Sequence, residues 1–139
     1  MSATMIYAIS ILTYFSGIGF IFSIVWSFNR SAAYKMLSMA AGTDLQKTSQ
    51  TSPDIGKAMN FLLMDFTSQM CGMNLFALLI IWIPFRHGAF WAWTALWFYP
   101  VMFAWHYLHY AKGTRFSKTQ IVYCILSCLA LILTYNHFQ

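Results

Sequence analysis

One carboxylate and two imidazoles lie inside otherwise apolar segments of this chain. His106 and His109 are three residues apart, which places them on one face of a helix, and Asp65 lies in an earlier segment at a similar expected depth. One aspartate facing two histidines is the donor set of a facial triad for a divalent metal. The same set suits a proton relay. Haem ligation by His106 or His109 is a further alternative, although haem-binding four-helix proteins usually offer axial histidines on facing helices, and His106 has no mate at its own expected depth. The alternative is that both histidines are polar anchors near the membrane interface, bonded to headgroups, to backbone or to Asp65.

The segment that contains Asp65 is polar on two sides. Gln69 and Gly72 follow Asp65 at four and seven residues, and Thr67 and Asn74 fall on the opposite side of the same helix. Polar groups at membrane depth are costly unless they have a partner or a function. We therefore expect this helix either in the centre of a bundle or between the bundle and another protein.

A stripe of small residues runs along the first apolar segment. Ser16, Gly19, Ser23 and Ser27 recur at spacings of three, four and four residues. Because lipid tails are as apolar as leucine, helices in a membrane associate by close approach, and small side chains permit it. The stripe predicts a helix-packing surface, formed either with a partner subunit or within the protein's own bundle.

The third apolar segment is unusually aromatic and contains a proline. Trp91 and Trp93 lie near one expected end and Trp105 near the other, which is the pattern of an interfacial aromatic belt. Pro100 lacks the amide donor that the carbonyl of Leu96 would receive, so a kink is expected. A kinked aromatic helix could form the wall of a site for a lipid, a pigment or a quinone. Ordinary helix packing is the alternative.

The elements that must position these residues are four apolar segments, at about 5–28, 59–83, 90–111 and 119–135. Each has about the ~20 residues that a helix needs to cross a ~30 Å hydrocarbon core. The 139 residues are 60% hydrophobic and only 8% charged, against ~25% charged in soluble domains. We predict an all-α membrane protein, a single transmembrane domain over residues 1–139 built as an antiparallel four-helix bundle.

The basic residues indicate the orientation of this bundle. Loops 29–58 and 112–118 contain seven lysines and arginines, and the other side has only Arg86. The positive-inside rule places both loops in the cytoplasm and both termini outside. The net charge of +5 is spread over loops and forms no nucleic-acid footprint. The expected partners are therefore membrane lipids and other integral membrane subunits, and no nucleic acid.

Local signals mark the ends of several elements. Apolar residues at helical spacing between Ala33 and Ala41, followed by Gly42, predict a short helix along the cytoplasmic interface, unless the first helix simply continues past the membrane. Residues 43–51 are polar and are expected to be irregular. Ser52-Pro53-Asp54 predicts the start of the second long helix, and Pro84 its end. Ser117 with Gln120 predicts a capping box for the last helix.

Residues 84–93 read Pro-Phe-Arg-His-Gly-Ala-Phe-Trp-Ala-Trp. This segment resembles the turn Pro-Phe-Arg-x-Gly-x-x-Trp-Ala-Trp that joins helices two and three in small, uncharacterised bacterial four-helix membrane proteins. The resemblance implies the same topology and a bacterial cytoplasmic membrane, and that group has no settled activity to carry over. A second basic residue and an acid usually flank the glycine in those proteins, where this chain has His87 and Ala89.

The chain has no Gly-rich phosphate loop, no Cys-x-x-Cys and no nucleophile elbow. The leading hypothesis is a non-catalytic accessory or assembly subunit of a larger integral membrane complex. The alternative is a small metal- or haem-binding membrane redox protein or enzyme that uses Asp65, His106 and His109. A third hypothesis is a proton-coupled carrier or channel along the helix of Asp65 and Asn74.

Overall fold

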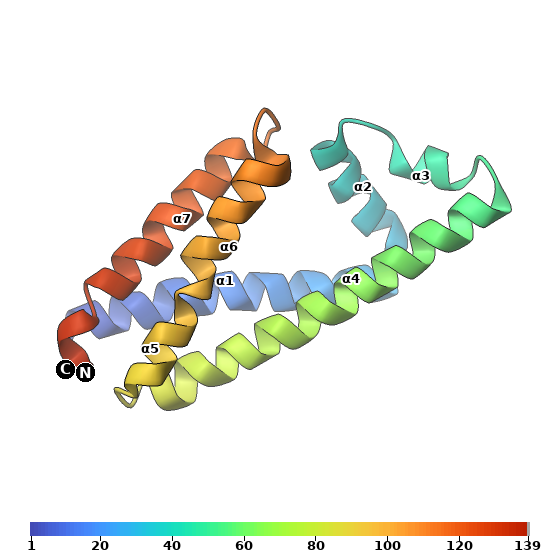
Figure 1. Ribbon diagram of the computed structural model, residues 1–139. Coiled ribbons are helices and arrows are strands. Elements are labelled where there is room, and N and C mark those ends of the chain that lie inside the picture. Colours follow the sequence, from blue (N-terminus) through green and yellow to red (C-terminus); the bar gives the residue numbers. More distant parts are fainter. Residues whose placement is uncertain (139) are drawn as a thin grey trace.

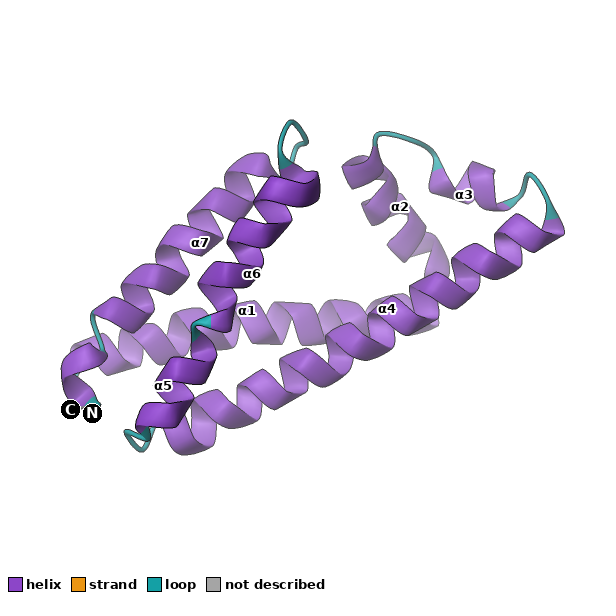
Figure 2. Cartoon of the chain, in the orientation of Figure 1, coloured by secondary structure: helices purple, strands orange, loops and turns teal. Residues whose placement is uncertain are grey.

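The structure, a computed structural model, describes residues 1–138, with the side chain of Tyr110 excepted. Within these residues the chain is helical and contains no strand (Figures 1 and 2). The elements in the first half are α1 (Ala3–Phe28), α2 (Arg30–Ala41), α3 (Leu45–Ser49), α4 (Pro53–Ile80) and η1 (Ile81–Phe85). Those in the second half are α5 (Phe90–Leu96), α6 (Phe98–His106), η2 (Tyr107–Ala111), α7 (Ser117–Ile132) and η3 (Tyr135–His137).

Three stretches of the described chain are helical, long and apolar enough to cross a membrane. They are Ala3–Phe28, Pro53–Phe85 and Ser117–His137, with 26, 33 and 21 residues. Their length and composition indicate an integral membrane protein, and the predicted all-α class is confirmed for the described residues.

The fourth predicted span, 90–111, is helical but broken near its middle. α5 ends at Leu96, and the amide of Trp97 turns back to the carbonyl of Thr94 at 3.2 Å, one residue short of an α-helical bond. The helix restarts at Phe98. The cause is the expected one, because Pro100 has no amide hydrogen to donate to the Leu96 carbonyl.

The helices pack as two antiparallel pairs, α1 with α4 and α6 with α7, which are joined by contacts between α1 and α7. α4 packs chiefly on α1, α6 packs chiefly on α7, and α7 also packs on α1, so α1 lies between α4 and α7 (Figure 1). This differs from a closed four-helix bundle, in which α4 and α6 would also be neighbours. The main core lies toward the end where the two termini meet and includes Leu12, Ile81 and Leu96.

The opposite end of α1 and α4 is closed by α2. Asn29 ends α1 and also caps α2, because its side-chain oxygen accepts a hydrogen bond from the Ala32 amide at 3.1 Å. α2 is therefore a separate helix and not an extension of α1. Tyr34 of α2 is buried against Leu63 of α4 and donates its hydroxyl to Asn60 at 3.3 Å. Gly42 then ends α2 with a φ of 68°, as its position predicts.

The predictions for the loop after α2 and for the start of α4 have different outcomes. Residues 45–49 were expected to be irregular, but they form α3 because the Asp44 carboxylate accepts the Lys47 amide at 3.0 Å. The start of α4 is confirmed, with Pro53 in the first turn and the Ser52 hydroxyl accepting the Ile55 amide at 3.2 Å.

Two other predicted helix ends need correction. The helix does not end before Pro84. Pro84 lies inside a last turn of π-helix, η1, in which the Arg86 amide donates to the Ile81 carbonyl at 3.1 Å. The turn is completed at Gly88, with a φ of 78°. The capping box of α7 does not form, because Ser117 is already the first helical residue.

Candidate functional site

The small-residue stripe of α1 is packed inside the protein. Ser16 and Ser23 are fully buried. A Cβ added at Gly19 would lie 2.6 Å from the side-chain amide of Asn74 on α4, so only glycine allows the two helices this approach. Ser27 continues the stripe and donates its hydroxyl to the Ser23 carbonyl at 2.8 Å. Of the two interpretations of the stripe, the contacts support packing within the chain.

The buried polar groups next to this stripe bond mainly to their own helices. Thr67 donates to the Met64 carbonyl at 3.1 Å, and Asn74 donates to the Met70 carbonyl at 2.7 Å. Ser16 donates to the Leu12 carbonyl at 3.0 Å and also shares a hydrogen bond with the Tyr99 hydroxyl of α6. Such local bonds satisfy polar groups inside a membrane protein. They describe a packed interior and not a path for ions.

The other side of α4 carries four polar or small residues that the chain leaves exposed: Asp65, Ser68, Gln69 and Gly72. We call them the α4 polar face. At about 3.6 residues per turn, they lie on the side of α4 opposite Thr67 and Asn74. A Cβ added at Gly72 would meet no atom within 4 Å. α4 is therefore polar on two sides, as its sequence predicts, but only one of those sides is covered.

Within the α4 polar face, the amide Nε2 of Gln69 donates to the Asp65 carboxylate at 2.8 Å. Among the residues that the structure describes, this is the one hydrogen bond made to that carboxylate. A carboxylate has about four acceptor positions. Asp65 thus keeps most of its capacity to accept hydrogen bonds from outside the chain.

The α4 polar face falls within the candidate membrane span Pro53–Phe85. The roughly 20 residues from Asp65 to Phe85 rise about 30 Å, which is about the thickness of the hydrocarbon core. Apolar side chains flank the face at both ends, with Phe61 70% exposed and Phe76 63% exposed. Counted from the Phe85 end of the span, a layer of this thickness would reach Asp65 and include Gln69 and Gly72.

The structure does not bring Asp65 together with His106 and His109. His106 is half-buried at the end of α6, and His109 in η2 is exposed with its ring 4.0 Å from that of Trp105. The described residues contain no group of three His, Cys, Asp or Glu side chains able to hold a metal ion. Asp65 and the two histidines are not neighbours because the tight turn after η1 holds α5 and η1 together only at their ends. Beyond the turn, α6 packs on α7 and not on α4.

The inward-facing aromatic residues of the third segment pack on neighbouring helices. The Phe103 ring lies 5.1 Å from that of Phe15 in α1 and 5.3 Å from that of Tyr123 in α7. Trp93 donates its indole N–H to the Leu131 carbonyl at 2.8 Å. Trp91 and Trp105 are exposed, together with Phe90, Val101 and Leu108, and a lipid, pigment or quinone could contact the segment at these side chains.

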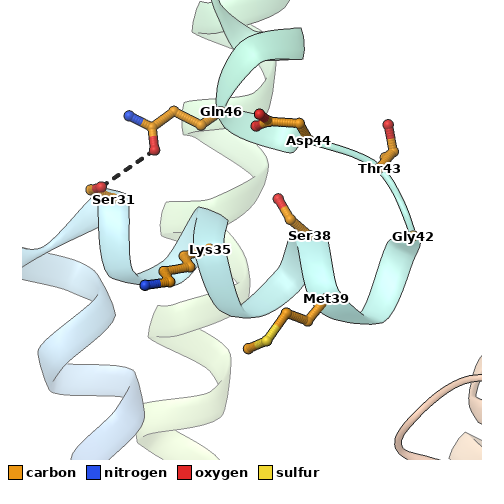
Figure 3. Close-up of a pocket in the computed structure, with 8 residues that line it drawn as sticks. All are labelled: Ser31, Lys35, Ser38, Met39, Gly42, Thr43, Asp44 and Gln46. Atoms are coloured by element: carbon orange, nitrogen blue, oxygen red, sulfur yellow. Dashed lines mark hydrogen bonds between the residues drawn. The ribbon is translucent and has the colours of Figure 1, made fainter.

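Two pockets lie at opposite ends of the molecule. One, of about 520 Å³, lies between α2 and α3 (Figure 3) and is lined mainly by polar side chains, among them Asp44, which caps α3. In it Ser38 accepts the Leu45 amide at 2.9 Å, and Ser31 donates to Gln46 at 3.4 Å. These hydrogen bonds hold α2 and α3 together, so the turn between the two helices accounts for the pocket.

The second pocket, of about 340 Å³, lies where the termini meet the turn after η1. Ser2 and Thr4 contact Nε2 of His137 at 2.5 and 3.2 Å, which ties the first and last helical turns together. Arg86 and His87 line the same pocket. The guanidinium of Arg86 lies 5.7 Å from the ring of Trp82, an arrangement typical of an arginine at a membrane interface.

Comparison with protein-family models, with curated proteins and with solved structures gives no match to this chain. Its function is therefore inferred from its own residues. The exposed α4 polar face is the feature that its internal packing leaves without an explanation.

Proposed function

We propose that this protein is a non-catalytic accessory or assembly subunit of a larger integral membrane complex. The observation that supports the proposal is the α4 polar face. Hydrocarbon offers no hydrogen-bond partner to a carboxylate or an amide. Each unsatisfied polar group there costs several kcal/mol of free energy, as it does on transfer from water to an apolar solvent. A second protein that covers this face removes that cost.

The same face does not favour the other hypotheses. A carrier or channel needs polar groups that line a path through the protein, whereas Asp65 points away from α1 and Asn74 is packed against Gly19. A metal centre built on Asp65, His106 and His109 needs the three side chains close together, but α4 packs chiefly on α1, whereas α6 and η2 pack on α7. Haem usually takes axial histidines from facing helices, and these two histidines lie on one helical segment. The accessory subunit is the hypothesis that uses an outward-facing polar surface.

The proposal includes a fourth crossing of the membrane by residues 90–111. α5, α6 and η2 follow one another with a single interruption at Trp97, and Pro100 accounts for it. Kinked helices of this kind are tolerated in membranes when neighbouring groups cover the exposed backbone. The Cys124 thiol of α7 donates to the Pro100 carbonyl at 3.5 Å, which holds α7 against this part of the segment.

With four crossings, loops 29–58 and 112–118 lie in the cytoplasm of a bacterium and both termini lie outside, together with the turn at Arg86. The clustering of the two termini with Arg86 and His87 around one pocket supports this topology. Single cysteines at Lys47, Arg115 and Arg86, in a background without native cysteines, test it with a membrane-impermeant maleimide. We expect only the cysteine at position 86 to react in intact cells. Labelling of positions 47 and 115 from opposite sides would contradict the topology.

Extraction in a mild detergent followed by native mass analysis tests the function itself. We expect the protein in an assembly well above its own 16.0 kDa, together with at least one other membrane protein. A clean monomer in every mild detergent tested would contradict the proposal.

A further inference from the structure

Resting on the proposed function, we infer that the α4 polar face receives a transmembrane helix of a different protein, which presents an arginine or lysine to Asp65. The site is the outward side of α4 from Asp65 to Gly72. The cation is placed at the cytoplasmic edge of the apolar layer.

The shape of the face fits a helix. Ser68 and Gly72 are four residues apart and both exposed, which is the small-xxx-small spacing that lets two transmembrane helices approach closely. The space beside Gly72 is open, since a Cβ there would meet no atom within 4 Å. Phe61 and Phe76 project at either end of the face and are 70% and 63% exposed. A helix seated over Gly72 would pack between these two rings.

The charge of the face fits a cation on that helix. Asp65 accepts one hydrogen bond, from Gln69, and its remaining oxygen lone pairs suit a guanidinium or an ammonium group. Membrane proteins concentrate Lys and Arg at the cytoplasmic ends of their helices. Asp65 lies at that depth in the proposed orientation. A partner helix therefore carries its cations where Asp65 can pair with them.

A second copy of this chain does not fit the same face. Two copies inserted in the same orientation place their Asp65 carboxylates at equal depth, and a two-fold contact through α4 would bring them side by side. Like charges repel strongly where water is scarce. On α4 itself the nearest lysine is Lys57, two turns further toward the cytoplasm. The occupant with matching charge is thus a helix of another protein.

The test is a photocrosslinkable amino acid at Gln69 of the full chain, in cells that produce the native complex. The matched control places the same group at Ile125, which is 53% exposed on α7. Crosslinked peptides are identified by mass spectrometry. We expect the Gln69 position to capture a transmembrane helix of one other protein, with an Arg or Lys within about one turn of the crosslink at its cytoplasmic end.

Charge substitutions complete the test. We expect Asp65→Asn and Asp65→Arg to lower the crosslinked product by about tenfold or more. Asp54→Asn, which changes an exposed acid in the first turn of the same helix, should leave it unchanged. Changing the captured cation to aspartate should restore the product in the Asp65→Arg protein. This restoration also shows that Asp65→Arg is folded.

Each remaining outcome separates the inference from the proposed function. Crosslinks from Gln69 to a second copy, or a captured helix without a cation, would overturn the inference. An assembly that persists unchanged in Asp65→Asn, with crosslinks only from other surfaces, would overturn it and leave the accessory role standing. Crosslinks to lipid only, from a protein that is monomeric by native mass, would overturn both.

Discussion

Replacement of Gly19 by alanine tests the contact that joins α1 to α4. The added Cβ would lie 2.6 Å from Nδ2 and Oδ1 of Asn74 and 2.7 Å from its Cγ, where ordinary contacts are above 3.4 Å. Asn74 is only 5% exposed and donates to the Met70 carbonyl at 2.7 Å. It cannot move aside without losing that hydrogen bond or separating the helices. Gly17 is the matched control, because a Cβ there meets nothing within 4 Å.

The expected magnitude follows from two opposing effects. Overpacking of this kind costs about 1–3 kcal/mol, and an alanine in place of a helical glycine contributes about 1 kcal/mol of stabilisation. Gly19→Ala should therefore lower the free energy of unfolding by about 1 kcal/mol, and Gly17→Ala should raise it by about 1 kcal/mol. The difference between the two variants, about 2 kcal/mol, is independent of how much helix propensity counts in a membrane.

The assay is unfolding by SDS in mixed micelles, followed by the fluorescence of the six tryptophans. A double-mutant cycle with Asn74→Ala isolates the contact. With Asn74 shortened, Gly19→Ala should change from destabilising to stabilising, which corresponds to a coupling of about 2 kcal/mol. Equal stability of Gly19→Ala and Gly17→Ala would refute the packing of α1 on α4 described above.

Three further substitutions probe the α6–α7 side of the protein. Tyr99→Phe removes the hydroxyl that is bonded to Ser16 and should cost about 1 kcal/mol in the same SDS assay; no change would mean that this bond does not stabilise the fold. Trp93→Phe removes the donor to the Leu131 carbonyl and should speed amide exchange over residues 133–138, whereas unchanged exchange would contradict the anchoring role of the indole. Pro100→Ala restores a donor at the break between α5 and α6 and should slow amide exchange over residues 97–101. Exchange that stays fast would assign the break to another cause.

Local signals in the sequence predicted some element ends and missed others, as Pro84 and Ser117 show. Ser52 and Pro53 start α4 because a side-chain oxygen and a preset φ act within one turn. Pro100 breaks the third segment for an equally local reason. Asp44 shows the limit of such signals, since it caps α3, a helix of five residues of which four are polar and which has no apolar periodicity.

Contacts between helices were less predictable, because they depend on tilt and crossing angle. Asp65 and His106 have similar expected depth, yet the tight turn between their helices fixes only the ends at Pro84 and Phe90. From there α6 follows α7, whose Tyr123 packs on Phe103. No spacing within either helix contains that information.

Most residues of the candidate site could be predicted from the sequence, but the side of α4 that is covered could not, because that depends on a contact between helices. The polar residues at Asp65, Gln69 and Gly72 are visible in the sequence, as is their separation from Thr67 and Asn74. Which of the two sides α1 covers is decided by the fit of Asn74 against Gly19, a contact between distant segments. Ser68 was missed, although its spacing of four from Gly72 is the signal that would have found it.

The most direct test of the account is the native mass of Gly72→Leu beside that of the unchanged protein, both extracted from native membranes in one mild detergent. The Cβ of a leucine at this exposed position would meet no atom of the chain within 4 Å, so we expect the variant to fold and to unfold in SDS like the unchanged protein. We expect the unchanged protein in an assembly well above 16.0 kDa and Gly72→Leu alone at its own mass. The same mass for both proteins, whether as assemblies or as monomers, would contradict the claim that the exposed side of α4 joins this protein to a partner.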